Sequence, residues 1–380
     1  MDNLIKKKLK PFQIYISPPH PTGNELGLLA EVVNQNWLAP AGPHLIQFEK
    51  KIENYLGNQF FATALQSGTA AIHLGLQLLG VGKGDIVLCQ SLTFVASANP
   101  IKYLGATPVF IDSEQETWNI CPILLEEAIK DLIIKKQKPK AIVAVHLYGM
   151  PYQVEALQLI SKKYEIPILE DSAEALGSTF KNEPCGSFGD MSVFSFNGNK
   201  IITTGGGGVL ICKSKVLQQQ AFKLATQAKE PTPHFEHIEL GYNYRMSNLN
   251  AAVGCAQWKA LTKYVKKRRA TFQYYKEQLT TINGISFLEE PEGFYTNRWL
   301  SVMLTENLEH REYIRKKLEI HGIESRPVWK PLHLQPLYAH GKSYINGVSE
   351  AVFERGLCLP SGSQLTFQQL EMITSLIQQG

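Results

Sequence analysis

The chain has 380 residues, of which 44% are hydrophobic and 19% are charged, and its formal net charge is +4. This composition excludes extensive disorder, and the length predicts two or three domains. With 38 basic and 34 acidic residues, the charge is too balanced to indicate a nucleic-acid-binding protein, although it is compatible with a small anionic ligand.

The N-terminus carries the basic run KKKLK at residues 6–10, but no apolar stretch follows it. We therefore expect a solvated end and no signal peptide. No run of about 18 apolar residues could span a bilayer, so no membrane partner is expected. The six cysteines are scattered without a CxxC pair, which predicts buried free thiols in a reduced, cytoplasmic protein rather than a disulfide framework or a zinc ribbon.

The first regular patterns are helical. Residues up to about 40 are expected to be irregular and to wrap onto the body. Apolar residues then recur at helical spacing over residues 42–57. The stretch SGTAAIHLGLQLLG (67–80) begins with cap-forming residues and ends in glycine, which predicts a second, capped helix.

Strands and helices alternate in the next part of the chain. We expect strands at 85–89, 107–112, 141–147, 166–171 and 192–196, and helices at 121–133 and 152–164. The strands are near-continuous apolar runs, as in a parallel sheet that is covered by helices on both faces. Ligands of such sheets bind beyond the carboxyl ends of the strands, so the residues after each strand are candidates for chemistry.

The pattern changes after Gly254. Residues 257–282 predict a long, basic, amphipathic helix that connects to a second unit. A strand and two helices follow, at 296–305, 308–322 and 368–380. The sequence therefore predicts an α/β protein with a large domain over residues 1–255, including the N-terminal segment, and a smaller α/β domain over residues 256–380.

Two candidate ligand contacts come early in the large domain. Ser67, Gly68 and Thr69 begin a helix, and such a start either binds an anion through free amides and hydroxyls or is an ordinary cap. Phe94 follows the strand at 85–89 and would either stack on a planar ligand or pack in the core.

Two further candidates come later. Glu170 and Asp171 end an apolar strand, where a carboxylate is costly to bury unless it is paired, for example by a charged ligand nitrogen; a helix N-cap is the alternative. Lys200 lies on a turn within VFSFNGNKIITTGGGGVL, either as a desolvated amine nucleophile or as a surface lysine. The glycines at 205–208 favour a functional site because they allow close approach of the backbone and positive φ.

Several familiar motifs do not occur. The GGGG run lacks the following Lys-Ser or Lys-Thr of a P-loop, no GxGxxG begins a helix after the first strand, and there is neither HExxH nor GxSxG. The histidines show no metal-ligand spacing. A Ser/His/Asp triad assembled from distant positions remains open.

An anion-binding helix start, an aromatic residue, an aspartate at a strand end and a lysine occur in this order along the chain. Together they describe a site for pyridoxal 5′-phosphate (PLP), whose phosphate needs a helix start, whose ring nitrogen needs a carboxylate and whose aldehyde needs a lysine. The sequence also resembles the sugar-nucleotide aminotransferases of the DegT/StrS type, which have the PLP-dependent transferase fold of type I, with a mostly parallel central sheet. The resemblance extends over about residues 15–365, in the segments SGTAAIHLGLQLLGVGKGD, TFVASANPIKYLGATPVFID, LEDSAEALGS, FSFNGNKIITTGGGGVL, GYNYRMSNLNAAVGCAQ and ESRPVWKPLHLQPLY.

The resemblance implies roles around the cofactor ring. Lys200 would form the internal aldimine, and Asp171 would pair with the pyridine nitrogen and keep it protonated. Phe94 would stack on the ring. Glu174 lies where many members have His or Gln, near the phenolic oxygen of the cofactor.

The resemblance also implies a phosphate site that is shared between two subunits. Gly68, Thr69 and Ser195 would hold the phosphate from the same chain, and Asn243 would reach the phosphate of the neighbouring subunit. A homodimer is therefore expected.

The implied reaction is a transamination in two halves. Glutamate would convert PLP to pyridoxamine phosphate and leave as 2-oxoglutarate, and a ketosugar nucleotide would then accept the amino group, with Lys200 moving the proton. A related branch has histidine in place of the lysine and dehydrates sugars, so Lys200 favours transamination.

The segments GIESRPVWKPLHLQPLY and SLTFVASANPIKYLGATPVFIDSEQETWN most resemble the branch that acts on UDP-linked 4-keto-6-deoxy-N-acetylhexosamine, as in bacillosamine synthesis. Candidate substrate contacts are Trp37, Arg326, Trp329, Lys330 and His333, with packing as the alternative role of the two tryptophans. The alternatives are a GDP- or dTDP-linked ketosugar, or a non-catalytic, nucleotide-binding regulatory protein.

Overall fold

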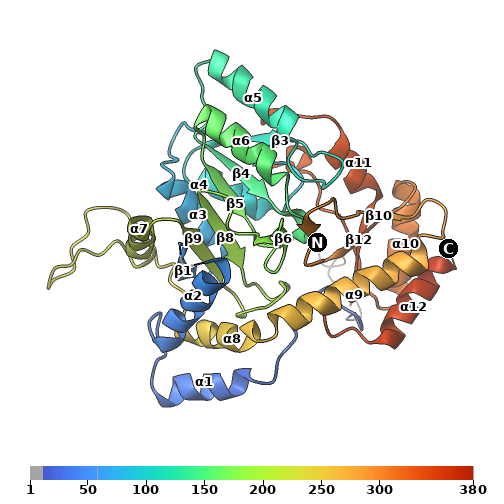
Figure 1. Ribbon diagram of the computed structural model, residues 1–380, viewed down its shortest axis with the longest axis horizontal. Helices are drawn as coiled ribbons and strands as arrows, with labels where there is room; N and C mark the ends of the chain where they lie inside the picture. The colour runs from blue at the N-terminus through green and yellow to red at the C-terminus, as the bar shows by residue number, and fades with distance from the viewer. Residues whose placement is uncertain (1–11, 58, 380) are drawn as a thin grey trace, which may run out of the picture.

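The computed structural model describes residues 12–57 and 59–379, so the basic run at 6–10 lies outside it. An eight-stranded sheet forms its centre (Figure 1). In spatial order its strands are β1 (Phe61–Leu65), β9 (Gly208–Cys212), β8 (Met191–Ser195), β5 (Ile168–Asp171), β4 (Ala141–Val145), β2 (Ile86–Gln90), β3 (Thr107–Ile111) and β14 (Ser343–Tyr344). Neighbours from β8 to β14 are parallel, whereas β9 is antiparallel to both β1 and β8. The predicted mostly parallel sheet is confirmed.

Both faces of the sheet are buried. One face packs against helices α3 (Gly68–Leu78), α4 (Asn99–Tyr103) and α7 (Lys215–Ala225), and the other against α2 (Pro43–Leu56), α5 (Pro122–Ile134), α6 (Val154–Tyr164) and α8 (Asn248–Trp258). Within β4, Val143 points to the first face and Ile142 to the second. Because successive strand residues point to opposite faces, burial on both sides requires apolar residues at almost every position.

The C-terminal part is built on a smaller sheet. Its strands are, in spatial order, β10 (Ser286–Phe287), β12 (Ser301–Leu304), β15 (Gly356–Leu359) and β13 (Arg326–Pro327), and helices α10 (Leu308–Ile320), α11 (Val348–Arg355) and α12 (Phe367–Gln378) lie around it. The long helix α9 (Leu261–Leu279) runs from α8 towards α10 and α12 (Figure 1). A short three-stranded sheet is formed by β11 (Phe294–Tyr295), β6 (Thr179–Phe180) and β7 (Glu183–Pro184).

Two expectations about this part need correction. The helix expected at 257–282 is interrupted, since α8 ends at Trp258 and α9 begins at Leu261. The C-terminal part also supplies β14 to the large sheet, where it pairs with β3. The division at residues 255–256 falls inside α8 and remains a prediction.

The N-terminal segment wraps onto the C-terminal part, as expected. Ile14 bridges to Ile323, and the amide of Ser361 donates to the carbonyl of Ile16. The expectation that the first 40 residues are irregular is wrong for α1 (Glu25–Asn34). The segment ELGLLAEVVN carries Leu28, Leu29 and Val32 at helical spacing, so the signal for this helix was present in the sequence, although only Val32 is buried.

The glycine run lets the backbone pack closely at the start of α3. A Cβ on Gly208 would lie 2.3 Å from the carbonyl carbon and oxygen of Ser67. A Cβ on Gly207 would lie 2.3 Å from Oγ1 of Thr204, and Gly205 has a φ of +83°. β9 can therefore pass this helix start only because residue 208 has no side chain.

We expect Gly208→Ala to lower the free energy of unfolding by about 1–3 kcal/mol, because the added methyl group must push Ser67 and β9 apart. Urea denaturation at fixed protein concentration measures the change. The matched control is Gly27→Ala in α1, where a Cβ meets no atom within 4 Å and alanine should stabilise by about 0.5–1 kcal/mol. Equal effects of the two substitutions would contradict the packing argument.

Candidate active site

A cavity of about 310 Å³ lies at the carboxyl ends of β5 and β8, beside the start of α3. Its size is within the range of small-molecule sites. The sequence-predicted residues that line it are Gly68, Thr69, Phe94, Asp171, Glu174, Ser195, Lys200 and Trp329. The structure thus brings together residues that are up to 261 positions apart in the chain (329 − 68).

One end of the cavity is built to receive an anion. Ser67 caps α3, and its Oγ accepts a hydrogen bond from the amide of Ala70 at 3.1 Å. The amides of Gly68 and Thr69 have no hydrogen-bond partner within the described residues. Ser195 lies opposite, since a Cβ on Gly68 would be 3.1 Å from its Cβ. Two free amides, hydroxyls and the helix dipole together fit a phosphate group.

Lys200 enters the cavity from a turn after β8. Its amide donates to the carbonyl of Asn197, and its Nζ lies 3.7 Å from Oε1 of Glu174 and 4.0 Å from the centre of the Trp299 ring. Burial lowers the pKa of Lys200, although the charges of Glu174 and Asp171 act in the opposite direction. The surface-lysine alternative is therefore wrong, and a lowered pKa increases the fraction of neutral, nucleophilic amine.

Asp171 is buried at the end of β5 and faces the cavity. Its Oδ2 accepts from Oγ of Ser97 at 2.7 Å, and its Oδ1 accepts from the amide of Ala173 at 3.1 Å. Burial raises the pKa of Asp171, while these hydrogen bonds and the charge of Lys200 only partly offset the rise. A protonated ring nitrogen would supply the cationic partner that this carboxylate needs.

The carboxyl group of Glu174 is held by the backbone of Tyr148, which has an unusual conformation. Its Oε2 accepts from the amide of Tyr148 at 2.7 Å, and Tyr148 has a φ of +52°, which is uncommon for a residue other than glycine. Burial raises the pKa of Glu174, and the charge of Lys200 and the amide of Tyr148 limit the rise. Glu174 is thus a buried carboxyl group held beside the amine of Lys200.

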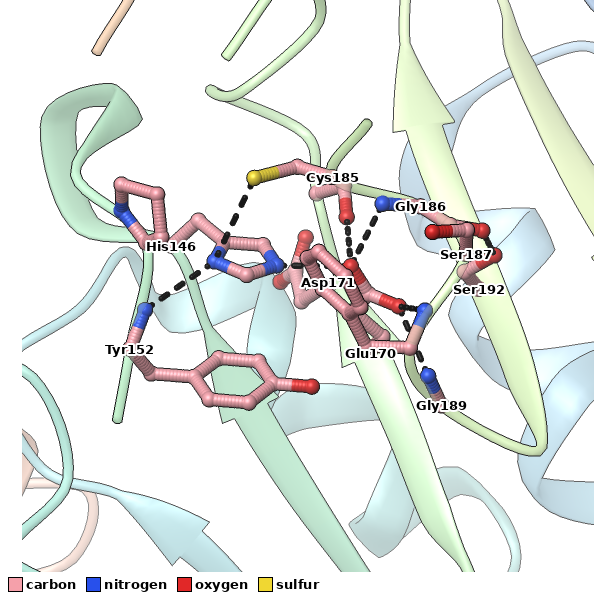
Figure 2. Close-up of polar contacts among 12 residues, drawn as sticks. His146, Tyr152, Glu170, Asp171, Cys185, Gly186, Ser187, Gly189 and Ser192 are labelled. Atoms are coloured by element: carbon pink, nitrogen blue, oxygen red, sulfur yellow. Dashed lines mark hydrogen bonds and ion pairs between the residues drawn. The ribbon is translucent and has the colours of Figure 1, made fainter. Parts of the chain in front are cut away.

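Glu170, the other carboxylate at this strand end, is not among the residues that line the cavity, and its carboxylate points towards His146 and the loop at 186–189 (Figure 2). Its Oε1 lies 2.7 Å from Nε2 of His146, and its Oε2 accepts from the amides of Phe188 and Gly189, both at 2.8 Å. Burial acts to raise the pKa of Glu170, but His146 and the loop amides lower it overall. Glu170 therefore fixes the loop at 186–189 against β5.

The walls of the cavity are aromatic. Phe94 and Trp329 lie with ring centres 5.2 Å apart and tilted by 49°, and Trp329 also stacks on Tyr148. Phe94 is 50% exposed, which favours its role as a ligand contact over packing in the core.

Other predicted residues lie away from this cavity. Trp37, Asn243 and Lys330 are exposed, and Arg326 lines a second cavity. His333 is engaged on both sides, with Nδ1 2.6 Å from Oγ of Ser91 and Nε2 3.1 Å from Oε1 of Glu350. Their substrate and partner-subunit roles remain predictions.

The sequence interpretation missed Ser97, Tyr148 and Trp299. Ser97 lies in the TFVASANP stretch that was already singled out for Phe94, so its position after a strand was an available signal. Trp299 had no such signal, because only the tertiary fold brings it beneath Lys200.

Comparisons with known proteins give a consistent assignment. Residues 20–378 match the model of the DegT/DnrJ/EryC1/StrS aminotransferase family. EpsN of Bacillus subtilis, whose name gives PLP-dependent aminotransferase as a provisional function, is 45% identical over 93% of this chain and 92% of its own length. The GDP-perosamine synthase of Escherichia coli O157:H7 is 36% identical over 96% of this chain and 97% of its own length.

Solved structures extend this agreement. The PLP form of a Streptococcus pneumoniae protein, described provisionally as a sugar aminotransferase, has a TM-score of 0.87 at 28% identity and covers 97% of this chain and 99% of its own length. Its pyridoxamine phosphate form matches with the same TM-score. Other relatives are named for UDP-linked sugars, including a Shewanella sediminis UDP-4-amino-4-deoxy-L-arabinose–oxoglutarate aminotransferase, which is 29% identical.

The fold and the site define a PLP-dependent sugar aminotransferase. The chain belongs to the DegT/DnrJ/EryC1/StrS aminotransferase family. The residues present fit the cofactor, since the free amides at the start of α3 suit its phosphate, Asp171 suits its ring nitrogen and Lys200 suits its aldehyde.

The two adjacent carboxylates should respond differently to neutralisation. We expect Glu170→Gln to lower the free energy of unfolding by about 3 kcal/mol or more, because it breaks a buried, fully hydrogen-bonded pair with His146. The folded-state pKa of Glu170 lies below its usual 4.5, so this difference should be present above that pH and shrink as the pH falls further.

Asp171→Asn is the matched variant. It should change the stability of the cofactor-free protein little and weaken PLP binding about tenfold or more, because a hydrogen bond to a charged group contributes about 1.5–3 kcal/mol. Denaturation curves and PLP titrations of both variants test the distinction. Equal loss of stability in the two would show that Asp171 is structural.

Proposed function

We propose that this enzyme transfers the amino group of glutamate to a 4-keto-6-deoxy sugar nucleotide. The observation that carries the proposal is the desolvated amine of Lys200, placed 3.7 Å from Glu174 in the cavity that also contains Asp171. No other lysine lines this cavity within the described residues.

The side chains divide the work of a proton transfer. Bound PLP supplies an electron sink that stabilises the negative charge left when a substrate carbon loses its proton. Lys200, neutral in part because burial lowers its pKa, takes that proton as a base and returns it as an acid. Glu174, whose pKa is raised, can hold or return a proton at the amine. Asp171 would pair with the protonated ring nitrogen of the cofactor.

The identity of the amino donor rests on the family. The Shewanella sediminis relative is named for 2-oxoglutarate, the keto acid that glutamate leaves behind. We infer that glutamate is also the donor here. Phe94 and Trp329 make one wall of this cavity aromatic.

A second cavity of about 320 Å³ offers a place for the nucleotide. It shares Asn199, Trp299 and Trp329 with the first cavity. It is also lined by Arg326, which is 66% exposed in its side chain and pairs with Glu324 at 2.8 Å. An exposed guanidinium beside the sugar site suits a pyrophosphate. We propose a UDP-linked N-acetylated ketosugar, on the resemblance of the segment at 322–338.

A GDP-linked ketosugar is the second candidate. The GDP-perosamine synthase of Escherichia coli covers nearly the whole chain at 36% identity, which is higher than the identity of the UDP-sugar relatives. The two candidates share the chemistry at Lys200 and differ only in the base that is bound.

A homodimer would complete the site. The segment that follows α7 projects from the body (Figure 1), and Asn243, which bridges to Thr226, lies exposed at its base. Phe235, Ile238 and Leu240 on the same segment expose large apolar surface. We propose that this segment packs against a second copy, so that Asn243 reaches the phosphate end of the partner's cavity.

Removing the lysine tests the catalytic proposal. Borohydride reduction of the PLP-loaded protein should fix the cofactor to the peptide that contains Lys200, as mass spectrometry would detect. Lys200→Ala should lose this label and reduce the amino-transfer rate by about 10²–10⁴-fold or more. Lys130→Ala, a change at an exposed lysine on α5, is the control and should keep both. A non-catalytic regulatory protein would instead leave bound PLP unchanged when glutamate is added.

Competition between nucleotides tests the substrate proposal. UDP should displace a bound sugar nucleotide at lower concentration than GDP or dTDP. Arg326→Ala should weaken UDP binding about tenfold, because a charged hydrogen bond to phosphate contributes about 1.5–3 kcal/mol. Tighter binding of GDP would establish the second candidate instead.

A further inference from the structure

Arg268 is buried in the middle of α9, with only 1% of its surface exposed. Among the described residues no carboxylate forms an ion pair with it. Burial lowers the pKa of Arg268 to about 9, so it is still charged at neutral pH. A buried cation without a carboxylate partner is costly, which raises the question of what its hydrogen bonds achieve.

The guanidinium joins two segments that are distant in sequence. Its Nη1 donates to the carbonyl of Trp299 at 2.6 Å, just before β12. Its Nη2 donates to Oγ of Ser17 at 3.0 Å, in the N-terminal segment. Nε has no partner within the described chain.

The two residues that accept hydrogen bonds from Arg268 both donate to the carbonyl oxygen of Asn199. Oγ of Ser17 donates to the carbonyl of Asn199 at 2.7 Å, and Nε1 of Trp299 donates to the same oxygen, also at 2.7 Å. The next residue is Lys200, whose Nζ lies over the ring of Trp299. Arg268 therefore fixes both the backbone that carries the amine and the ring beneath it.

We infer that Arg268, acting through Ser17 and Trp299, is a positioning residue that sets where the amine of Lys200 lies in the cavity. This inference rests on the proposed function of Lys200. The planar guanidinium donates in two fixed directions, and an ammonium group cannot reproduce that geometry with one head group. Position matters because small displacements of a catalytic group reduce the rate strongly.

Two carboxylates and one aromatic ring face Lys200. Glu174 and Asp171 are the carboxylates, at and after the end of β5. The face of the Trp299 ring favours the protonated form of the Lys200 nitrogen. If the ring moves away, the protonated form loses this contact, and the nitrogen should lose its proton at lower pH.

The experiment uses full-length, PLP-loaded protein and four variants. Ser17→Ala and Arg268→Lys each remove part of the link while keeping the charge at residue 268. Arg269→Met is the matched control, because Arg269 is the next residue of α9 but binds Glu290 and the carbonyl of Thr296 instead. Lys200→Ala reports on the proposed function itself.

Two readouts separate positioning from simple stability. In Ser17→Ala and Arg268→Lys, the pH midpoint of the visible band of lysine-bound cofactor should fall by about half a unit. Their kcat should fall about tenfold, with KM for glutamate within about twofold of wild type. Arg269→Met should lower the unfolding midpoint without moving either readout.

The outcomes distinguish the two ideas. A wild-type band that is lost in Lys200→Ala, but titrates identically in wild type, Ser17→Ala and Arg268→Lys, would overturn the positioning role and leave the proposed function intact. A band that persists in Lys200→Ala would overturn the function and, with it, this inference. Should Arg268→Lys fail to fold, Ser17→Ala alone decides, because it removes only one hydroxyl.

Discussion

The central sheet is buried on both of its faces, and the chemistry of the protein depends on this constraint. Polar side chains have no place among the apolar strands, so they gather where the strands end. The cavity accordingly lies at the carboxyl ends of β5 and β8. Burial there lowers the pKa of Lys200 and raises that of Asp171. Such desolvation is costly for a charged group without a function, but it is typical of groups that react with or bind a cofactor.

Three carboxylates close together in sequence serve three different purposes because of how strand and turn direct them. Glu170 and Asp171 are neighbours on β5 and therefore point to opposite faces. Glu170 ties down the loop at 186–189, whereas Asp171 faces the cavity. Glu174 lies beyond the strand, where the left-handed Tyr148 presents its amide to it. Sequence proximity alone could not assign these roles.

Much of the fold and of the site could be predicted from the sequence, for a physical reason. Doubly buried strands leave long apolar runs, and the residues that follow them sit at the reactive edge, which identified Phe94, Asp171 and Lys200. Features that rest on tertiary contacts were not predictable. Trp299 meets Lys200 only after the chain has folded. Helix α1 is a different case, because its leucines and valines recur at helical spacing and the interpretation overlooked them. The proposed role of Asn243 would depend on a second subunit.

The strand β14 ties the two halves of the molecule together. It comes from the C-terminal part yet forms the outermost strand of the large sheet, beside β3. A protein truncated near residue 255 would lose β14 and expose the backbone donors and acceptors of β3. Such unpaired edge groups can pair with a strand of another molecule. The large sheet is thus completed by the C-terminal part, and a design that uses the N-terminal half alone must protect the backbone groups that pair with β14.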